Sequence, residues 1–360
     1  MYDQIREDTL FLMFYASVAM LALIACCYLL VRRSNAIAPD VIPPARLRRW
    51  TAAFFAAIAL CHLWYLPTYF LTSPDEVMLG YLIAGWLDCM TVIPLMIVIL
   101  LTMLQDRRRP LWPVCVMMVP FVIGLAWCIV SRSDDFLLVI FVYFLLMCFG
   151  LIIYMVGAIR QYGRWLRDNY ADLEHKEVWQ GFVVLAIYLL VYAVYLLDVG
   201  EQIYEYAMEV IIIILVCYLL WRVETLSDLS IPEGTTKNVS TSATFPEKNI
   251  GLLLKQHCEE SQLYLQYDIS LPQLAQIIGT NRLYLSQHFS TLGMTYNAYI
   301  NGLRIQHFIS LYREATATHQ FITAQQLAHQ SGFRSYNTFS VAFKKIMGTT
   351  ATEWMRSVAV

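Results

Sequence analysis

Apolar residues fill the first 222 positions in long runs, and an ordinary amphipathic pattern replaces them further along the chain. A helix needs about 20 apolar residues to cross the hydrocarbon core of a bilayer. Seven segments have roughly this length and few charges: 9–31, 50–71, 77–104, 111–130, 136–159, 181–197 and 207–221. The last two are short, so whether both cross the membrane stays open. The pattern predicts an all-α protein with a polytopic transmembrane helix bundle of about seven spans in residues 1–222.

The positive charges of the short loops predict an orientation. Arg and Lys concentrate in the loops 32–49, 105–110 and 160–180, whereas the loops between them carry mainly acidic residues. Positive residues are retained on the cytoplasmic side. We therefore expect a bacterial inner (cytoplasmic) membrane protein with its N-terminus outside and its C-terminal domain in the cytoplasm. The first apolar stretch exceeds the core of a typical secretory signal peptide, so a retained helix is expected.

Two ionisable residues, His62 and Asp88, fall inside the predicted spans. Such residues are costly in hydrocarbon and by default mark a functional site. The alternative, which we favour, is that they pair with neighbouring polar groups and hold helices together. The basic and aromatic segment 159–180 is expected to lie in the anionic inner headgroup region as a resting surface helix, and the alternative is a signalling element.

Composition supports a division of the chain into an apolar part in the membrane and a polar part in water. The chain is 59% hydrophobic and 14% charged, whereas a soluble domain is roughly a quarter charged. Residues 223–248 are rich in Ser, Thr, Pro and Gly from Ile231 onward and lack hydrophobic periodicity, which predicts a flexible cytoplasmic linker. The net charge is −2, but residues 245–360 hold nine Lys and Arg against six Asp and Glu. This mildly basic part is compatible with a nucleic-acid partner.

Two units with the same helix, glycine turn and helix pattern follow the linker. In the first unit Gly279 ends a short amphipathic helix, and Asn281 is a suitable N-cap for the next. About fifty residues later Gly332 separates two further helices, the second expected over 335–346. A long helix over about 296–314 is expected to set the spacing of the units. This is the helix-turn-helix pattern, whose second helix enters the major groove of DNA.

The residues of the second unit, ITAQQLAHQSGFRSYNTFSVAFKKIMGTTATEWMR (322–356), resemble the signature of the AraC/XylS transcription regulators. The matching positions are Ala328, Gly332, Phe333, Ser335, Phe339, Phe343, Lys344, Lys345, Gly348 and Arg356. LPQLAQIIGTNRLYLSQHF (271–289) is similar to the family's first unit, and YINGLRI (299–305) resembles its connecting helix. The resemblance covers about the last hundred residues. It implies a double helix-turn-helix DNA-binding domain over 249–360.

The resemblance also implies which residues meet DNA, with helices 281–290 and 335–345 in successive segments of the major groove. Carried over to this sequence, the base-facing residues are Leu283, Ser286 and Gln287 in the first helix and Tyr336, Asn337, Ser340 and Val341 in the second. Gln and Asn pair bidentately with adenine, and Leu offers an apolar contact to the thymine methyl group. Arg282, Lys344 and Lys345 are expected to bind phosphates, which positions the protein without reading sequence. Ser335 completes the expected set, and Arg304 is implied to be mainly structural.

The sequence departs from the family pattern at three positions. Val341 stands where the family usually has Arg, Ser290 where it has Lys, and Ala351 where it has Pro. The first two differences remove positive charge from the DNA face, so a low affinity of the monomer is expected. The third concerns a turn.

These observations predict a membrane-embedded one-component transcription regulator, controlled by a signal sensed in or through the bundle. Its expected partners are double-stranded DNA and the lipid bilayer, while a homodimer and a small-molecule or lipid signal in the bundle stay open. No catalytic residue, cofactor or metal site is expected, and the chain is not expected to be an enzyme. The alternative is a membrane transporter or receptor whose C-terminal domain is a regulatory protein-binding module. Stimulus, target promoters, sign of regulation and oligomeric state do not follow from the sequence.

Overall fold

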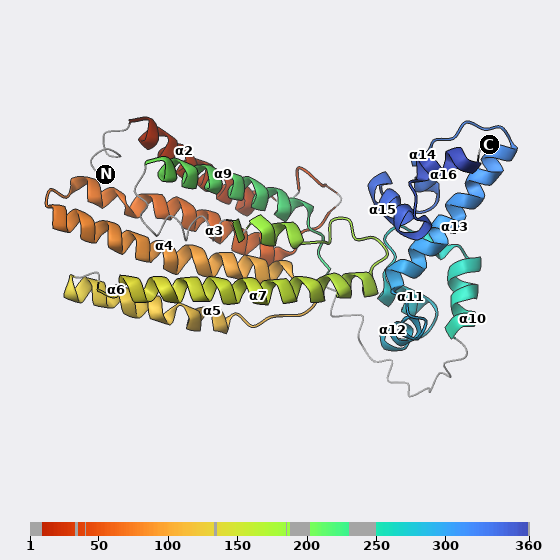
Figure 1. The fold of residues 1–360 in the computed structure, drawn as a ribbon, viewed down its shortest axis with the longest axis horizontal. Coiled ribbons are helices and arrows are strands. Elements are labelled where there is room, and N and C mark those ends of the chain that lie inside the picture. The colour runs from red at the N-terminus through yellow and green to blue at the C-terminus, as the bar shows by residue number, and fades with distance from the viewer. Residues whose placement is uncertain are drawn as a thin grey trace. The chain divides into compact units, whose positions relative to one another are not determined.

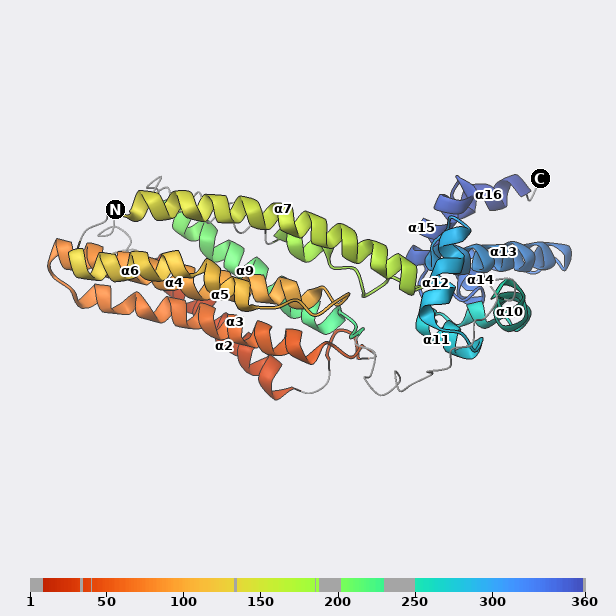
Figure 2. The same cartoon turned by 90° about the horizontal axis from the view of Figure 1, so that it is seen from below.

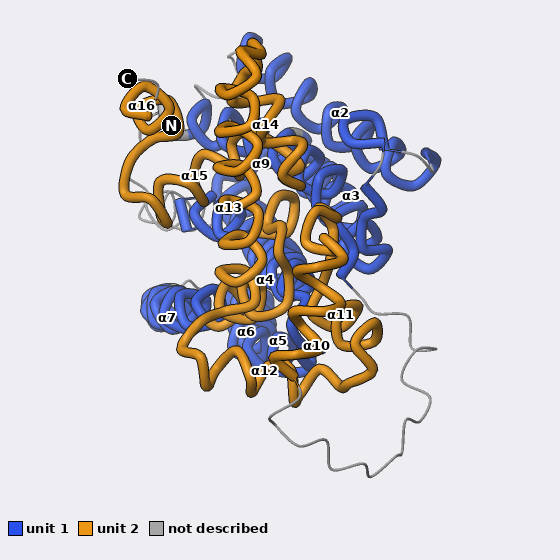
Figure 3. Tube along the Cα trace, turned by 90° about the vertical axis from the view of Figure 1, so that its right-hand side faces the viewer, with its two compact units in different colours: residues 1–160, 178–231 blue, residues 161–177, 232–360 orange. Residues whose placement is uncertain are grey.

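The computed structural model describes residues 9–32, 35–39, 41–132, 135–184, 186–187, 202–229 and 250–358 (Figure 1). Every regular element in these ranges is a helix, which confirms the all-α fold class. The chain divides into two compact units. One is Met1–Arg160 with Val178–Ile231, and the other is Gln161–Glu177 with Pro232–Val360 (Figure 3).

The first unit is a bundle of long helices. Its helices are α2 (Thr9–Val31), α3 (Ala45–Trp64), α4 (Pro74–Met103), α5 (Trp112–Met117), α6 (Val119–Ser131), the greater part of α7 (Leu137–Asn169) and α9 (Gln202–Thr225), with a 3-10 turn η1 (Leu66–Phe70) after α3. Helix α3 packs against α2 and α4, α9 contacts α2 and α3, and α4 contacts α5 and α6. The helices run alongside one another in both views (Figures 1 and 2).

Six of the described helical segments are long and apolar enough to cross a membrane: Thr9–Val31, Ala45–Thr68, Pro74–Met103, Trp112–Ser131, Leu138–Asn169 and Glu205–Thr225. In the most apolar window of each, at most 50% of the residues are buried. Large side chains such as Leu30, Val130 and Leu138 are exposed. Exposed apolar surface on this scale is typical of a membrane or protein interaction site, and on helices of this length it fits a bilayer. The predicted span 181–197 lies largely outside the described residues, so the count of about seven remains approximate.

Buried polar side chains connect the helices of this bundle. The Nε2 atom of His62 on α3 lies 3.2 Å from a carboxylate oxygen of Glu209 on α9. Asp88 on α4 accepts hydrogen bonds from Trp64 Nε1 at 2.9 Å and from the hydroxyl of Tyr65 at 2.7 Å. The two ionisable residues thus pair with neighbouring polar groups, as in the reading favoured from the sequence, and tie α3 to α4 and α9.

The second unit contains the repeated helix pairs. Its elements are α10 (Ile250–Leu254), a π-helical turn η3 (Lys255–Glu260), a 3-10 turn η4 (Leu263–Leu265), α11 (Leu271–Ile277), α12 (Arg282–Thr291), α13 (Tyr296–Ala317), α14 (Ala324–Gln330), α15 (Tyr336–Met347) and α16 (Ala351–Val358). Helices α11 and α12 form the first helix-turn-helix, and α14 and α15 form the second. The expected linker lies mostly outside the described residues.

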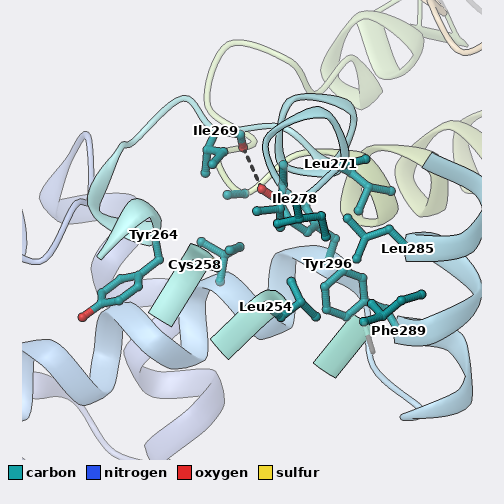
Figure 4. Close-up of a cluster of buried hydrophobic side chains, with 14 residues drawn as sticks. Leu254, Cys258, Tyr264, Ile269, Leu271, Ile278, Leu285, Phe289 and Tyr296 are labelled. Carbon is teal, nitrogen blue, oxygen red and sulfur yellow. Dashed lines mark hydrogen bonds between the residues drawn. The ribbon is translucent and has the colours of Figure 1, made fainter. Parts of the chain in front are cut away.

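Each helix pair has its own hydrophobic core, and α13 contributes to both. Tyr296 and Ile300 of α13 belong to the first core, which also holds the fully buried thiol of Cys258. Figure 4 shows this core, in which the hydroxyl of Tyr296 donates a 3.3 Å hydrogen bond to the carbonyl oxygen of Ile269. Ile305 and Phe308 belong to the second core. A single helix therefore holds both pairs in a defined relation.

Candidate DNA interface

Helix α12 has one buried and one exposed face. Its N-cap Asn281 accepts a 2.9 Å hydrogen bond from the backbone N–H of Tyr284, which satisfies one of the free donors at the start of the helix. Leu285 and Phe289 point into the first core. Of the predicted residues, Leu283 and Gln287 are exposed on the opposite side, Ser286 is half-buried, and Arg282 is exposed in the first turn.

Leu283 is a large apolar side chain that is exposed on this face of α12. It is 64% exposed, although Leu is a residue type that usually finds a place in a core. A single exposed Leu needs no special explanation. On the outer side of a helix-turn-helix second helix, however, it is suited to contact with a thymine methyl group.

Helix α15, in the second helix-turn-helix, repeats this arrangement. Phe339 and Phe343 are fully buried in the second core. The predicted residues Asn337, Val341, Lys344 and Lys345 are exposed, and Ser335, Tyr336 and Ser340 are half-buried. The structure therefore leaves Asn337, Val341, Lys344 and Lys345 exposed on α15, whereas Tyr336 packs partly against the second core.

Two of the predicted residues also have structural tasks. Ser335 is the N-cap of α15 and accepts a 3.3 Å hydrogen bond from the backbone N–H of Thr338. The ring of Tyr336 lies 5.6 Å from that of Phe339, between their centroids, so it packs partly against the core. Contact of either residue with DNA stays a prediction.

The positive side chains lie at the ends of the two helices. Arg282 is the first residue of α12. Lys344 and Lys345 occupy the last turn of α15, where a cation is favoured by the partial negative charge of the helix C-terminus. All three side chains are exposed, so their expected contact with phosphates stays a prediction.

Arg304 of α13 fixes the geometry of the domain from inside. Its guanidinium is almost fully buried, donates hydrogen bonds through Nη2 to the carbonyl oxygens of Gln266 at 2.9 Å and Tyr267 at 3.3 Å, and lies 5.6 Å from the ring centroid of Phe333. Burial lowers the pKa of Arg304 to about 10, so the group is still charged at neutral pH. The structural role implied by the resemblance is confirmed.

Sequence reasoning missed a set of contacts made by residues 161–177. Glu174 accepts a 3.2 Å hydrogen bond from the hydroxyl of Thr338, in the first turn of α15. Asp168 interacts electrostatically with Arg282. Thr338 and Glu174 are separated by 164 positions, and no motif connects them.

Comparisons with known proteins identify the C-terminal domain. Residues 274–357 match the family model of a helix-turn-helix domain. The TCP pilus virulence regulatory protein of Vibrio cholerae is 36% identical over 78 residues, 22% of this chain and 26% of that protein. An uncharacterized HTH-type transcriptional regulator of Staphylococcus aureus is 30% identical over 102 residues, 28% of this chain and 13% of that protein. No solved structure matches.

These matches confirm the AraC-type helix-turn-helix domain recognised in the sequence. The chain spans only an eighth to a quarter of the length of these relatives, and the family-model match lies in its C-terminal part. The C-terminal part of the chain is thus a helix-turn-helix domain similar to that of these transcription regulators, and the described residues of the other part include six apolar helices long enough to cross a membrane.

Proposed function

We propose that the chain is a one-component transcription regulator of the bacterial inner membrane, in which a signal received by the transmembrane bundle controls sequence-specific DNA binding. The observation that carries this proposal is the joining, in one chain, of two outward-facing helix-turn-helix units with helices suited to lipid. The proposed domains are the bundle at 1–222, the linker at 223–248 and the DNA-binding domain at 249–360, with residues 161–177 packed in the same compact unit as the DNA-binding domain.

The proposed DNA contacts follow from the two exposed helix faces. Leu283, Ser286 and Gln287 read bases from α12, and Tyr336, Asn337, Ser340 and Val341 read bases from α15. Arg282, Lys344 and Lys345 hold phosphates, and Ser335 lies at the start of the second reading helix. The exposure of Gln287 and Asn337 supports these roles, because a bidentate amide contact with adenine requires a free side chain.

The proposed orientation places the N-terminus outside and the C-terminal domain in the cytoplasm, where the chromosome lies. It is supported by the alternation of basic and acidic loops. The outer loops are short, so the stimulus enters the bundle or acts through the lipid. Its chemical class is left to experiment.

Chromatin immunoprecipitation with sequencing, on the full chain at its native expression level, tests the proposal. We expect enrichment of a small set of promoters and its loss in the double variant Gln287→Ala, Asn337→Ala. Gln306→Ala is the matched control, because Gln306 is an exposed amide on the connecting helix α13 and belongs to neither α12 nor α15. Equal enrichment of all promoters in wild type and double variant would refute sequence-specific regulation. Absence of any DNA enrichment would favour a receptor with a protein-binding module.

A further inference from the structure

The last turns of α7 and the loop after them belong to the same compact unit as the helix-turn-helix domain (Figure 3, orange). We call these residues, 161–177, the arm. Ala171 of the arm is completely buried in the first hydrophobic core. Beside it, Tyr170 forms an antiparallel β-bridge with Ser270, the N-cap of α11. The arm is therefore packed into the domain.

Polar contacts fix the arm in one register. The side-chain amide Nδ2 of Asn297 donates to the carbonyl oxygens of Tyr170 at 3.2 Å and Ala171 at 2.6 Å. The ammonium of Lys176 lies 3.5 Å from a carboxylate oxygen of Asp268. Both Lys176 and Asn169 are almost fully buried. Buried polar groups are costly unless they are paired, so contacts of this kind specify one docked arrangement.

The loop of the arm is also tied to α7. Tyr162 lies near the end of α7, and its hydroxyl donates a 3.0 Å hydrogen bond to the carbonyl oxygen of Lys176 at the far end of the loop. Helix α7 runs without interruption from Leu137 to Asn169. A displacement of α7 along or about its axis therefore carries the whole arm with it.

The arm places the acidic side chain of Glu174 at the start of α15 and brings the charge of Asp168 within electrostatic range of Arg282 on α12. Glu174 accepts the hydrogen bond of the Thr338 hydroxyl in the first turn of α15, and Asp168 interacts with Arg282 at the start of α12. The N-terminal turn of a helix favours an anion, and in protein–DNA complexes this anion is commonly a phosphate. The Glu174 carboxylate hence takes a position that suits the DNA backbone, and the negative charge of Asp168 partly offsets the positive charge of Arg282.

We propose that the arm is an intramolecular competitor of DNA: while it is docked, Glu174 occupies a phosphate position at the start of α15, and withdrawal of the arm by α7 frees that position. The inference rests on the proposed function, because it assumes that these helices bind DNA. An arm that is covalently attached acts at millimolar effective concentration, so weak contacts are enough to compete. The bundle would then control transcription through the position of α7.

The test uses the full chain in lipid nanodiscs and a fluorescent duplex that carries a promoter site recovered by immunoprecipitation. Glu174→Gln keeps an acceptor for Thr338 but removes the negative charge, and should tighten DNA binding about two- to fivefold. Asn297→Ala removes both hydrogen bonds to the arm backbone and should tighten binding at least as much. Glu314→Gln, an exposed carboxylate on α13, makes the same change in net charge and should leave the affinity at the wild-type value.

Hydrogen exchange supplies a second readout. A saturating concentration of the duplex should speed exchange of the backbone amides of 168–177. The inference is overturned if these amides are unaffected by DNA, or if Glu174→Gln binds no more tightly than Glu314→Gln. In either case a wild-type chain that still binds its promoter site leaves the proposed function standing. If neither wild type nor any variant binds a duplex, the proposed function fails and this inference fails with it.

Discussion

The Nε atom of Arg304 donates a 2.7 Å hydrogen bond to the carbonyl oxygen of Tyr264, which ties the connecting helix α13 to the turn η4. The same guanidinium donates hydrogen bonds to three carbonyl oxygens before α11, those of Tyr264, Gln266 and Tyr267. It also lies over the ring of Phe333 in the second helix-turn-helix. One buried side chain therefore contributes to the placement of both reading helices.

Replacing Arg304 by Lys should damage the whole domain although the charge is kept. An ammonium group lacks the planar fork that reaches several carbonyl oxygens at once, so we expect a loss of about 2–4 kcal/mol in the free energy of unfolding. Urea unfolding of a fragment that begins at residue 246 measures this change. Arg313→Lys, at an exposed position of the same helix, should change the free energy by less than about 0.5 kcal/mol. Equal midpoints for the two variants would contradict the role of Arg304.

The two turn glycines should differ in their response to substitution by Ala. Both have positive φ, +75° at Gly279 and +84° at Gly332. A Cβ atom on Gly332 would lie 2.6 Å from the carbonyl oxygen of Leu265, whereas one on Gly279 would meet nothing within 4 Å. Gly279→Ala should cost about 1 kcal/mol for the left-handed backbone, and Gly332→Ala about 1–3 kcal/mol more because a backbone atom must move. Thermal unfolding of the same fragment compares them, and equal losses would rule out the close approach.

The helix pairs were predictable because their signals are local. Gly279 and Gly332 end helices, Asn281 and Ser335 cap the next ones, and residues three or four positions apart decide which face is buried. The spans were predictable for a similar reason, since an apolar run must match the thickness of the bilayer. The ends of these helices were less predictable from the sequence, because hydropathy shows where the chain leaves the lipid and not where the helix stops. Helix α7 continues to Asn169, although the predicted span ended at 159.

The arm could not be predicted from its sequence. Its contacts join residues about 100 to 160 positions apart, such as Tyr170 with Ser270 and Glu174 with Thr338, and no periodicity links them. Its basic and aromatic side chains fit an anionic membrane surface and a protein surface equally well. Because hydrophobic pattern and charge do not distinguish these environments, only the fold shows that Ala171 is buried in the DNA-binding unit.

The orientation of the bundle leads to a test with reporter fusions. Alkaline phosphatase fused after residues 75, 133 and 202 should be active, because these sites lie in the loops expected outside the cytoplasm. Fusions after 40, 107 and 170 should be inactive, with a cytoplasmic reporter at the same sites as the reciprocal control. The arginine-rich loops are the physical reason, since their translocation is disfavoured. An irregular pattern would refute the proposed topology, and the fusion after 202 tests the span at 181–197 in particular.

The reading helices should divide their labour between recognising bases and holding the backbone. Asn337 is exposed in the first turn of α15, so Asn337→Ala should cost about 1–3 kcal/mol on the preferred site and relax the preference at one base position. Gln287→Ala should do the same from α12. Lys344→Ala should instead weaken binding to every duplex alike and reduce the slope of affinity against salt by about one unit, since one fewer counterion is released.

A core variant separates these effects from unfolding. Phe339 is fully buried among Phe308, Phe333 and Phe343. Phe339→Ala should therefore lower the free energy of unfolding by about 3–5 kcal/mol and unfold the second helix-turn-helix. Asn337→Ala and Lys344→Ala should melt at the wild-type temperature, because both side chains are exposed. Titration of each purified variant on matched and scrambled duplexes, alongside its thermal melt, makes the comparison. If Asn337→Ala and Lys344→Ala lose the same affinity on every duplex, Asn337 does not read a base, and α15 holds the DNA backbone only.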